Sequence, residues 1–139
     1  MDLSQFKTVE QLAAAIKTMD MVTSVAWTDY SGTSTIVGWA SYTVKQIFYK
    51  KIGKLVFVQY YLAGTSDDTV STFTVPYAGT ATMFVYANSL ATDNGTNADT
   101  AYILLPSTST VAGYPDKDGG AWTNTGDKKL WGQFWYEVA

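Results

Sequence analysis

Two pairs of acidic residues are the first candidates for chemistry, because hydrolysis of a glycosidic bond needs two carboxylates. Asp67 and Asp68 are adjacent, and Asp116 and Asp118 are separated by one lysine. A glycosidase holds its two carboxyl groups about 5 to 9 Å apart across a cleft, one of them usually in apolar surroundings. Both pairs lie in stretches rich in glycine or serine, which predicts solvated turns. We therefore expect these acids to be structural and the protein not to be an enzyme.

The residue types that the chain lacks narrow the chemistry further. It contains no histidine and no cysteine, which removes the commonest general base, the commonest metal ligand and the thiolate nucleophile. A serine nucleophile would need a lysine as its base, and no lysine lies in a suitable setting. The loops 93–99 and 116–120 carry oxygen ligands, but without the spacing of an EF-hand calcium loop. We expect no catalytic residue, no cofactor and no bound metal.

The charge and hydropathy of the chain argue against nucleic-acid and membrane partners. The formal net charge is −3, and all nine basic residues are lysines, whereas arginine is the usual partner of phosphate. No apolar run reaches the roughly 20 residues that span a bilayer, and the first residues lack the apolar stretch of a secretory signal. We expect no nucleic-acid partner, no membrane span and synthesis in a cytoplasm.

One helix is predicted near the N-terminus. Thr8 can act as its N-cap, and Gln11 lies three residues later, as in a capping box. Val9, Leu12 and Ile16 then fall on one face at helical spacing. Because a helix this short is marginal alone in water, its apolar face must dock on something. The two alternatives are the rest of the same domain and a second copy of the same helix in an oligomer.

The helix is predicted over residues 9–19, and the pattern then changes to short strands. Strands are expected over residues 21–28, 35–42, 43–52, 55–62, 70–75, 81–87, 100–105, 111–114 and 130–138. We also expect a hairpin turn at Gly53, a turn at Asn94-Gly95, and loops over residues 64–68 and 89–99. Turn signals about every 8 to 12 residues are typical of an all-β sandwich or barrel. We predict a helical segment over residues 1–20 and an antiparallel, jelly-roll-like β-sandwich over residues 21–139.

Aromatic residues give the last predicted strand two apolar faces. Trp131 and Trp135 are expected to point away from Leu130 and Phe134, because successive side chains alternate along a strand. A small sandwich usually keeps one face of each sheet in water, so a second aromatic face predicts a covered surface. The cover could be another subunit, the N-terminal helix or a sugar. We predict that Trp131 and Trp135 join the apolar helix face in an oligomer interface.

A sugar is the alternative occupant of exposed aromatic surface. Tyr30 and Trp122 are the candidate glycan contacts, because both are expected to lie in loops where their rings would be accessible. Such a site would need asparagine or aspartate acceptors beside an aromatic shelf.

A series of short motifs runs from Gly38 to Tyr136. In chain order they are Gly38-Trp39, then Phe48-Tyr49-Lys50-Lys51-Ile52-Gly53, the β run 55–62, Gly64-Thr65-Ser66, Phe73-Thr74-Val75-Pro76 and the aromatic closing segment 126–136. Together they resemble the distal β-domains of bacteriophage tail-fibre, head-fibre and related virion surface proteins.

The resemblance implies a non-enzymatic structural protein that decorates a phage head or tail. It also implies a homo-oligomer, with a trimer favoured, and contacts with other virion proteins. The expected location is then the virion, after synthesis in the host cytoplasm. The alternative function is a carbohydrate-binding or host-receptor-binding module, whose partner would be a host surface glycan.

Overall fold

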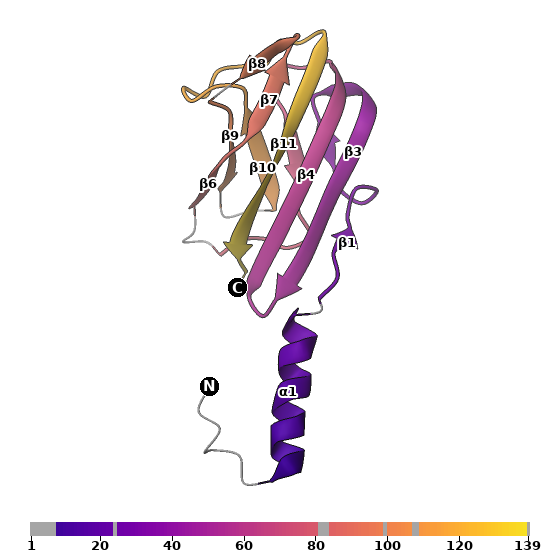
Figure 1. Cartoon of the computed structure of the whole chain (residues 1–139). Helices are drawn as coiled ribbons and strands as arrows, with labels where there is room; N and C mark the ends of the chain where they lie inside the picture. The colour runs from indigo at the N-terminus through magenta and orange to yellow at the C-terminus, as the bar shows by residue number, and fades with distance from the viewer. Residues whose placement is uncertain (1–7, 24, 81–83, 99, 107–108, 139) are drawn as a thin grey trace.

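The computed structural model describes residues 8–23, 25–80, 84–98, 100–106 and 109–138. These residues form one helix and two antiparallel sheets that lie face to face (Figure 1). The predicted fold class, an antiparallel all-β sandwich with one N-terminal α-helix, is confirmed.

The two sheets differ in size. The six-stranded sheet has the order β1 (Thr28–Asp29), β3 (Trp39–Ile52), β4 (Leu55–Ser66), β11 (Asp127–Glu137), β7 (Leu90–Asp93) and β8 (Thr96–Ala98). The five-stranded sheet has the order β2 (Ile36–Val37), β5 (Thr72–Thr74), β10 (Thr110–Tyr114), β9 (Tyr102–Pro106) and β6 (Phe84–Asn88). In Figure 1 the long strands β3, β4 and β11 stand in front of β9 and β10.

The strands from β4 to β11 pair as one long folded hairpin. The nested pairs are β4 with β11, β5 with β10, β6 with β9, and β7 with β8. This nested pairing is the jelly-roll-like feature of the sandwich. Between β6 and β7 the chain passes from the five-stranded to the six-stranded sheet through the single residue Ser89.

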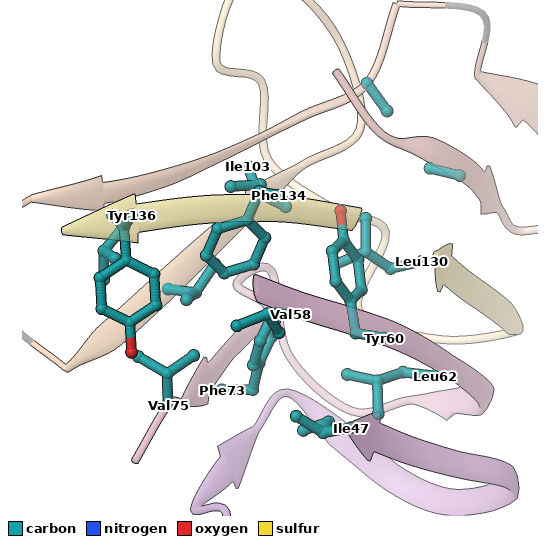
Figure 2. Close-up of a cluster of buried hydrophobic side chains, with 14 of the residues drawn as sticks. Ile47, Val58, Tyr60, Leu62, Phe73, Val75, Ile103, Leu130, Phe134 and Tyr136 are labelled. Carbon is teal, nitrogen blue, oxygen red and sulfur yellow. The ribbon is translucent and has the colours of Figure 1, made fainter. Parts of the chain in front are cut away.

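The core lies between the inner faces of the two sheets. Figure 2 shows the side chains of Tyr60, Phe73 and Phe134 meeting there, from strands of both sheets. The ring centroids of Tyr60 and Phe73 are 5.1 Å apart, and those of Tyr60 and Phe134 are 6.0 Å apart. On β11 the residues Leu130, Phe134 and Tyr136 are buried, as the predicted alternation requires.

The buried tyrosine hydroxyls have partners within the protein. The Tyr60 hydroxyl lies 2.8 Å from Ser89 Oγ, and Tyr136 donates to the Tyr77 carbonyl at 2.9 Å. Burial raises the pKa of both tyrosines above the ordinary value of 10.0. These bonds fix polar atoms that would otherwise destabilise the core.

Helix α1 (Val9–Thr23) begins as predicted and extends further than predicted. The Thr8 hydroxyl accepts a hydrogen bond from the Gln11 amide at 3.1 Å, which confirms Thr8 as the N-cap. The prediction of a strand over residues 21–28 is wrong, because the helix continues to Thr23 and β1 contains only two residues. Methionine is a good helix former, which favours this extension.

The two tight turns predicted from the sequence, at Gly53 and at Asn94-Gly95, are confirmed. Gly53, with φ of +59°, lies in the hairpin between β3 and β4. Asn94 and Gly95 have φ of 48° and 80°, and they connect β7 to β8. Positive φ at both central residues is the type I′ hairpin geometry that Asn-Gly favours. The surrounding segment 89–99, expected to be a loop, therefore contains the short strands β7 and β8.

The strands β3 and β4 are longer than the sequence pattern indicated. The predicted strand 43–52 extends back to Trp39, with register shifts that mark bulges near Ser41 and Tyr42. The expected loop after residue 63 is instead the end of β4, which runs to Ser66. Gly64 is buried in this strand, and a Cβ there would overlap the backbone carbonyl of Ser41. Gly64 is therefore needed for the close approach of a bulged strand.

Candidate functional site

The acidic pairs build loops, as predicted. Asp116 Oδ1 accepts hydrogen bonds from the amides of Asp118 and Gly120, at 2.9 and 2.8 Å. Asp118 forms an exposed ion pair with Lys117 at 2.7 Å. Asp68 Oδ1 accepts from the amide of its neighbour Thr69 at 2.6 Å. These contacts are those of turn-forming acids.

The loops considered for calcium show the same structural use of their acids. The Asp93 carboxylate accepts hydrogen bonds from the backbone amide of Thr123 at 3.0 and 3.1 Å, and from its hydroxyl at 3.1 Å. Asp99 lies outside the described residues. Within the part of the chain that the structure describes, no three histidine, cysteine, aspartate or glutamate side chains are grouped so that they could hold a metal ion.

The two predicted glycan contacts are not brought together on an accessible shelf. Trp122 is only 2% exposed, and its indole Nε1 donates to the Gly113 carbonyl at 2.8 Å. Its assignment as a glycan contact is therefore wrong, because its ring is packed into the core. Tyr30 is half-buried against the core, with its ring edge-on to Tyr49 at 6.1 Å. The sequence places Trp122 in a loop, but cannot show that the loop folds inward.

The predicted interface residues lie on two separate elements. Trp131 and Trp135 lie on the outer face of β11, opposite to its buried residues, and Trp135 is 55% exposed. Val9 and Ile16, on helix α1, are 81% and 50% exposed, and Leu12 is half-buried. Figure 1 shows α1 projecting beyond the end of the sandwich near the β3–β4 hairpin, instead of covering either sheet. Of the two alternatives for the helix, docking on its own domain is not what the structure shows.

The outer face of the six-stranded sheet carries aromatic and amide side chains in cross-strand rows. One row contains Gln46, Tyr61 and Trp131, which are register partners on β3, β4 and β11. The next row contains Phe48, Gln59 and Gln133. These two rows line a shallow hollow with a volume of about 470 Å³. A hollow of this size falls within the range of small-molecule sites.

A buried cation, Lys128, was missed by the sequence analysis. Its side chain is 0% exposed, and its Nζ donates to three backbone carbonyls: Gly38 at 2.8 Å, Asp68 at 3.1 Å and Val70 at 3.1 Å. The same nitrogen lies 5.4 Å from the ring centroid of Trp39 and 5.1 Å from that of Trp122. Both distances are within cation–π range.

The Lys128 ammonium joins parts of the chain that are distant in sequence. Its three acceptors lie just before β3 and in the connection from β4 to β5, whereas Lys128 itself is on β11. An ammonium has three donors, so each finds one carbonyl. One sequence signal could have found it: Lys128 lies two residues before Leu130 and therefore shares the inward face of the strand. Its role is structural, because its acceptors are all backbone carbonyls.

Burial lowers the pKa of Lys128 from 10.5 to about 8, and the carboxylates of Asp93, Asp67 and Asp68 oppose this shift. In the unfolded chain the pKa returns to its ordinary value. Between about pH 8 and 10.5 the unfolded state therefore binds one more proton than the folded state, so stability rises with pH there. Below about pH 8 Lys128 is protonated in both the folded and the unfolded state, so its titration no longer changes stability with pH.

We expect the free energy of unfolding to increase from pH 8 to pH 9.5, by at most about 1.4 kcal/mol per pH unit from this group. The range stops below pH 10, because the raised pKa values of Tyr60 and Tyr136 make stability fall above it. Urea unfolding at several pH values measures the effect, and Lys128→Met should remove it. A wild-type stability that is constant or falls over this range would contradict the expected change.

No protein-family model matches the chain, and no curated protein matches it. A functional proposal must therefore be based on the fold and the site. The part of the chain that the structure describes contains no helix long and apolar enough to cross a lipid bilayer.

Proposed function

We propose that this protein is a non-enzymatic, self-associating structural protein that decorates the head or tail of a bacteriophage particle. The observation that carries the proposal is helix α1, which projects from the sandwich (Figure 1) and on which the side chains of Val9 and Ile16 are exposed. The resemblance of segments 38–136 to phage virion surface domains supplies the setting. The other partners would be virion proteins, and the location would be the virion.

The helix favours a copy of itself as its partner. A helix of 15 residues is near the limit of stability alone in water, and most helices gain stability by packing an apolar face. Val9, Leu12 and Ile16 are spaced by three and then four residues, and Met19 continues this spacing in the sequence. Alternating spacings of three and four average 3.5 residues, which is the period of a coiled-coil seam.

The resemblance and the residues of the helix seam predict different numbers of copies. The resemblance to phage fibre domains favours a trimer. In a parallel coiled coil, β-branched residues at one seam position and leucine at the other favour two strands, and Val9, Ile16 and Leu12 follow that rule. The measured mass of the oligomer separates a trimer from a dimer, and either one supports self-association.

The acidic residues support a non-enzymatic role, because the contacts of Asp68, Asp93 and Asp116 are with nearby backbone amides. The alternative predicted from the sequence, a carbohydrate- or receptor-binding module, is compatible with self-association through the helix. An oligomer joined at α1 would leave the outer face of the six-stranded sheet free.

A charge placed on the helix seam tests the proposal. Ile16→Glu is expected to weaken self-association by at least about 10-fold, because a carboxylate would be buried among apolar side chains. Lys17→Glu introduces the same side chain one position away from the seam and should leave the oligomer intact. Sedimentation velocity of both variants and of the wild-type protein measures the effect. Equal sedimentation of wild type and Ile16→Glu would show that the helix does not hold the oligomer together.

A further inference from the structure

Two neighbouring hollows share one wall, which is formed by β11. The first, of about 470 Å³, lies over β3, β4 and β11 and includes Gln46, Gln59 and Trp131. The second, of about 590 Å³, lies where β6 passes into β7 and includes Asn88 and Thr100. Trp131, Gly132 and Gln133 line both hollows. A chain molecule laid across β11 would therefore contact Trp131 from both sides.

The first hollow offers apolar ring surface. Tyr61 and Trp131 are cross-strand partners with ring centroids 5.8 Å apart and ring planes inclined by 60°. Phe48 lines the same hollow and is half-buried. Partly exposed rings of this kind accept the C–H faces of a ligand and exclude water from them. The ligand must therefore have at least one apolar face.

The same hollow offers hydrogen-bonding groups at its centre. Gln59 Nε2 donates to Gln133 Oε1 at 3.4 Å, which uses one donor and one acceptor of the pair. The side-chain carbonyl of Gln59 and the side-chain amide NH2 of Gln133 can still bond to a ligand. Gln46 lies in the adjacent row. Side-chain amides both donate and accept, so they suit hydroxyl groups, which do the same.

The charge of the lining restricts the ligand further. The first hollow is lined by Gln46, Phe48, Gln59, Tyr60, Tyr61, Trp131, Gly132 and Gln133, none of which is charged at neutral pH. The second hollow adds one cation, Lys117, which is already paired with Asp118 at 2.7 Å. A charged ligand would lose its hydration without finding a partner charge in the first hollow. The site therefore suits a neutral ligand.

We propose that this surface binds a neutral saccharide chain of at least two sugar units laid across β11, with Trp131 as the stacking platform between them. A neutral pyranose has one C–H face for the ring and hydroxyls for the glutamine amides. A second copy of this chain is the less suitable occupant, because it would bury the amides of Gln59 and Gln133 against a sheet face instead of filling the hollow. The site replaces the one predicted at Trp122 and Tyr30, and it does not depend on the helix.

Binding of the labelled full-length protein to a printed array of neutral and acidic glycans tests the proposal. We expect one or more neutral glycans to be bound. Titration calorimetry with the free oligosaccharide that binds best should then show at least about 10-fold weaker binding for Trp131→Ala. Gln133→Ala, at an exposed position, should also weaken binding, and it guards against a Trp131 variant that folds poorly. Thermal unfolding of each variant reports on its folding.

Trp135→Ala is the matched control for Trp131→Ala. Trp135 lies on the same face of the same strand and is 55% exposed, but it lines neither hollow. This variant should bind within about 2-fold of the wild type. The proposal would be overturned by an array with no neutral glycan bound, by binding of acidic glycans alone, or by folded Trp131 and Gln133 variants that bind as tightly as the wild type.

Separate experiments test the saccharide proposal and the proposed self-association. If Trp131→Ala converted the oligomer to monomer in light scattering, this face would be a subunit contact and the saccharide proposal would be wrong. Ile16→Glu should keep the wild-type affinity per site even where it dissociates the oligomer. Failure of saccharide binding with an intact helix-dependent oligomer would thus leave the proposed structural function standing.

Discussion

Replacing Lys128 by methionine is expected to lower the free energy of unfolding by about 1 to 3 kcal/mol, because the cost of the lost hydrogen bonds exceeds the burial penalty that lowers the pKa of Lys128. Methionine is similar in length and apolar, so the cavity would remain filled while the three hydrogen bonds would be lost. The buried carbonyl of Gly38 would then lose this donor, whereas the part-buried carbonyl of Asp68 would keep its hydrogen bond from Ser66 Oγ and that of Val70 is nearer to solvent. A buried acceptor without a partner costs about 1 to 3 kcal/mol.

The loss of the ammonium would also remove its contacts with two indole rings. The ring centroids of Trp39 and Trp122 lie 5.4 and 5.1 Å from Lys128 Nζ, and each indole is itself hydrogen-bonded, to Ser71 and Gly113 respectively. The effect should therefore spread to the near-ultraviolet circular dichroism of the tryptophans. Urea unfolding at pH 7 gives the stability difference.

Lys129→Met is the matched control. Lys129 is the next residue on β11, points outward, and is half-exposed beside Asp127 at 3.4 Å. Removing an exposed ion pair of this kind should change stability by no more than about 0.5 kcal/mol. If both methionine variants unfolded at the wild-type urea concentration, Lys128 would not be the internal link between distant segments of the chain that its contacts indicate.

Removing residues 1–24 is expected to convert the oligomer to a monomer. The truncated chain begins at Val25 and keeps every strand of both sheets. Because α1 projects from the sandwich (Figure 1), its loss should leave the core intact and the melting temperature of the sandwich nearly unchanged. A large loss of stability on truncation would instead mean that the helix packs on the sandwich in solution.

Local rules predicted several elements of the fold correctly. The capping residue Thr8, the turn at Gly53 and the Asn94-Gly95 turn each depend on residues adjacent in the chain. The outward direction of Trp131 and Trp135 follows from the alternation of β11 alone. These features need no knowledge of which strands are neighbours, which is why the sequence suffices for them.

The wrong predictions concern residues whose surroundings are set by parts of the chain that are distant in sequence. Gly64 reads as a loop glycine, but it is mid-strand because the bulged strand β3 approaches it at Ser41. Trp122 reads as a loop aromatic, but it packs inward over Lys128. Propensity and periodicity describe one segment at a time, and tertiary packing overrides them at such positions.

The candidate saccharide site could also be predicted only in part from the sequence. Trp131 could be predicted to be accessible, whereas its neighbours could not be identified from sequence. The hollow exists because Tyr61 and Gln59 of β4 lie beside Trp131 and Gln133 of β11. That register pairs residues 70 and 74 positions apart, and strand order is not encoded in periodicity.

The mass of the protein in solution tests self-association most directly. Light scattering coupled to size-exclusion chromatography should be run on the full chain and on the chain that begins at Val25, over about a 100-fold range of concentration. We predict that the full chain has a mass of two or three times 15.2 kDa and that the truncated chain is a monomer. A full chain that remains monomeric at every concentration would contradict the proposed assembly.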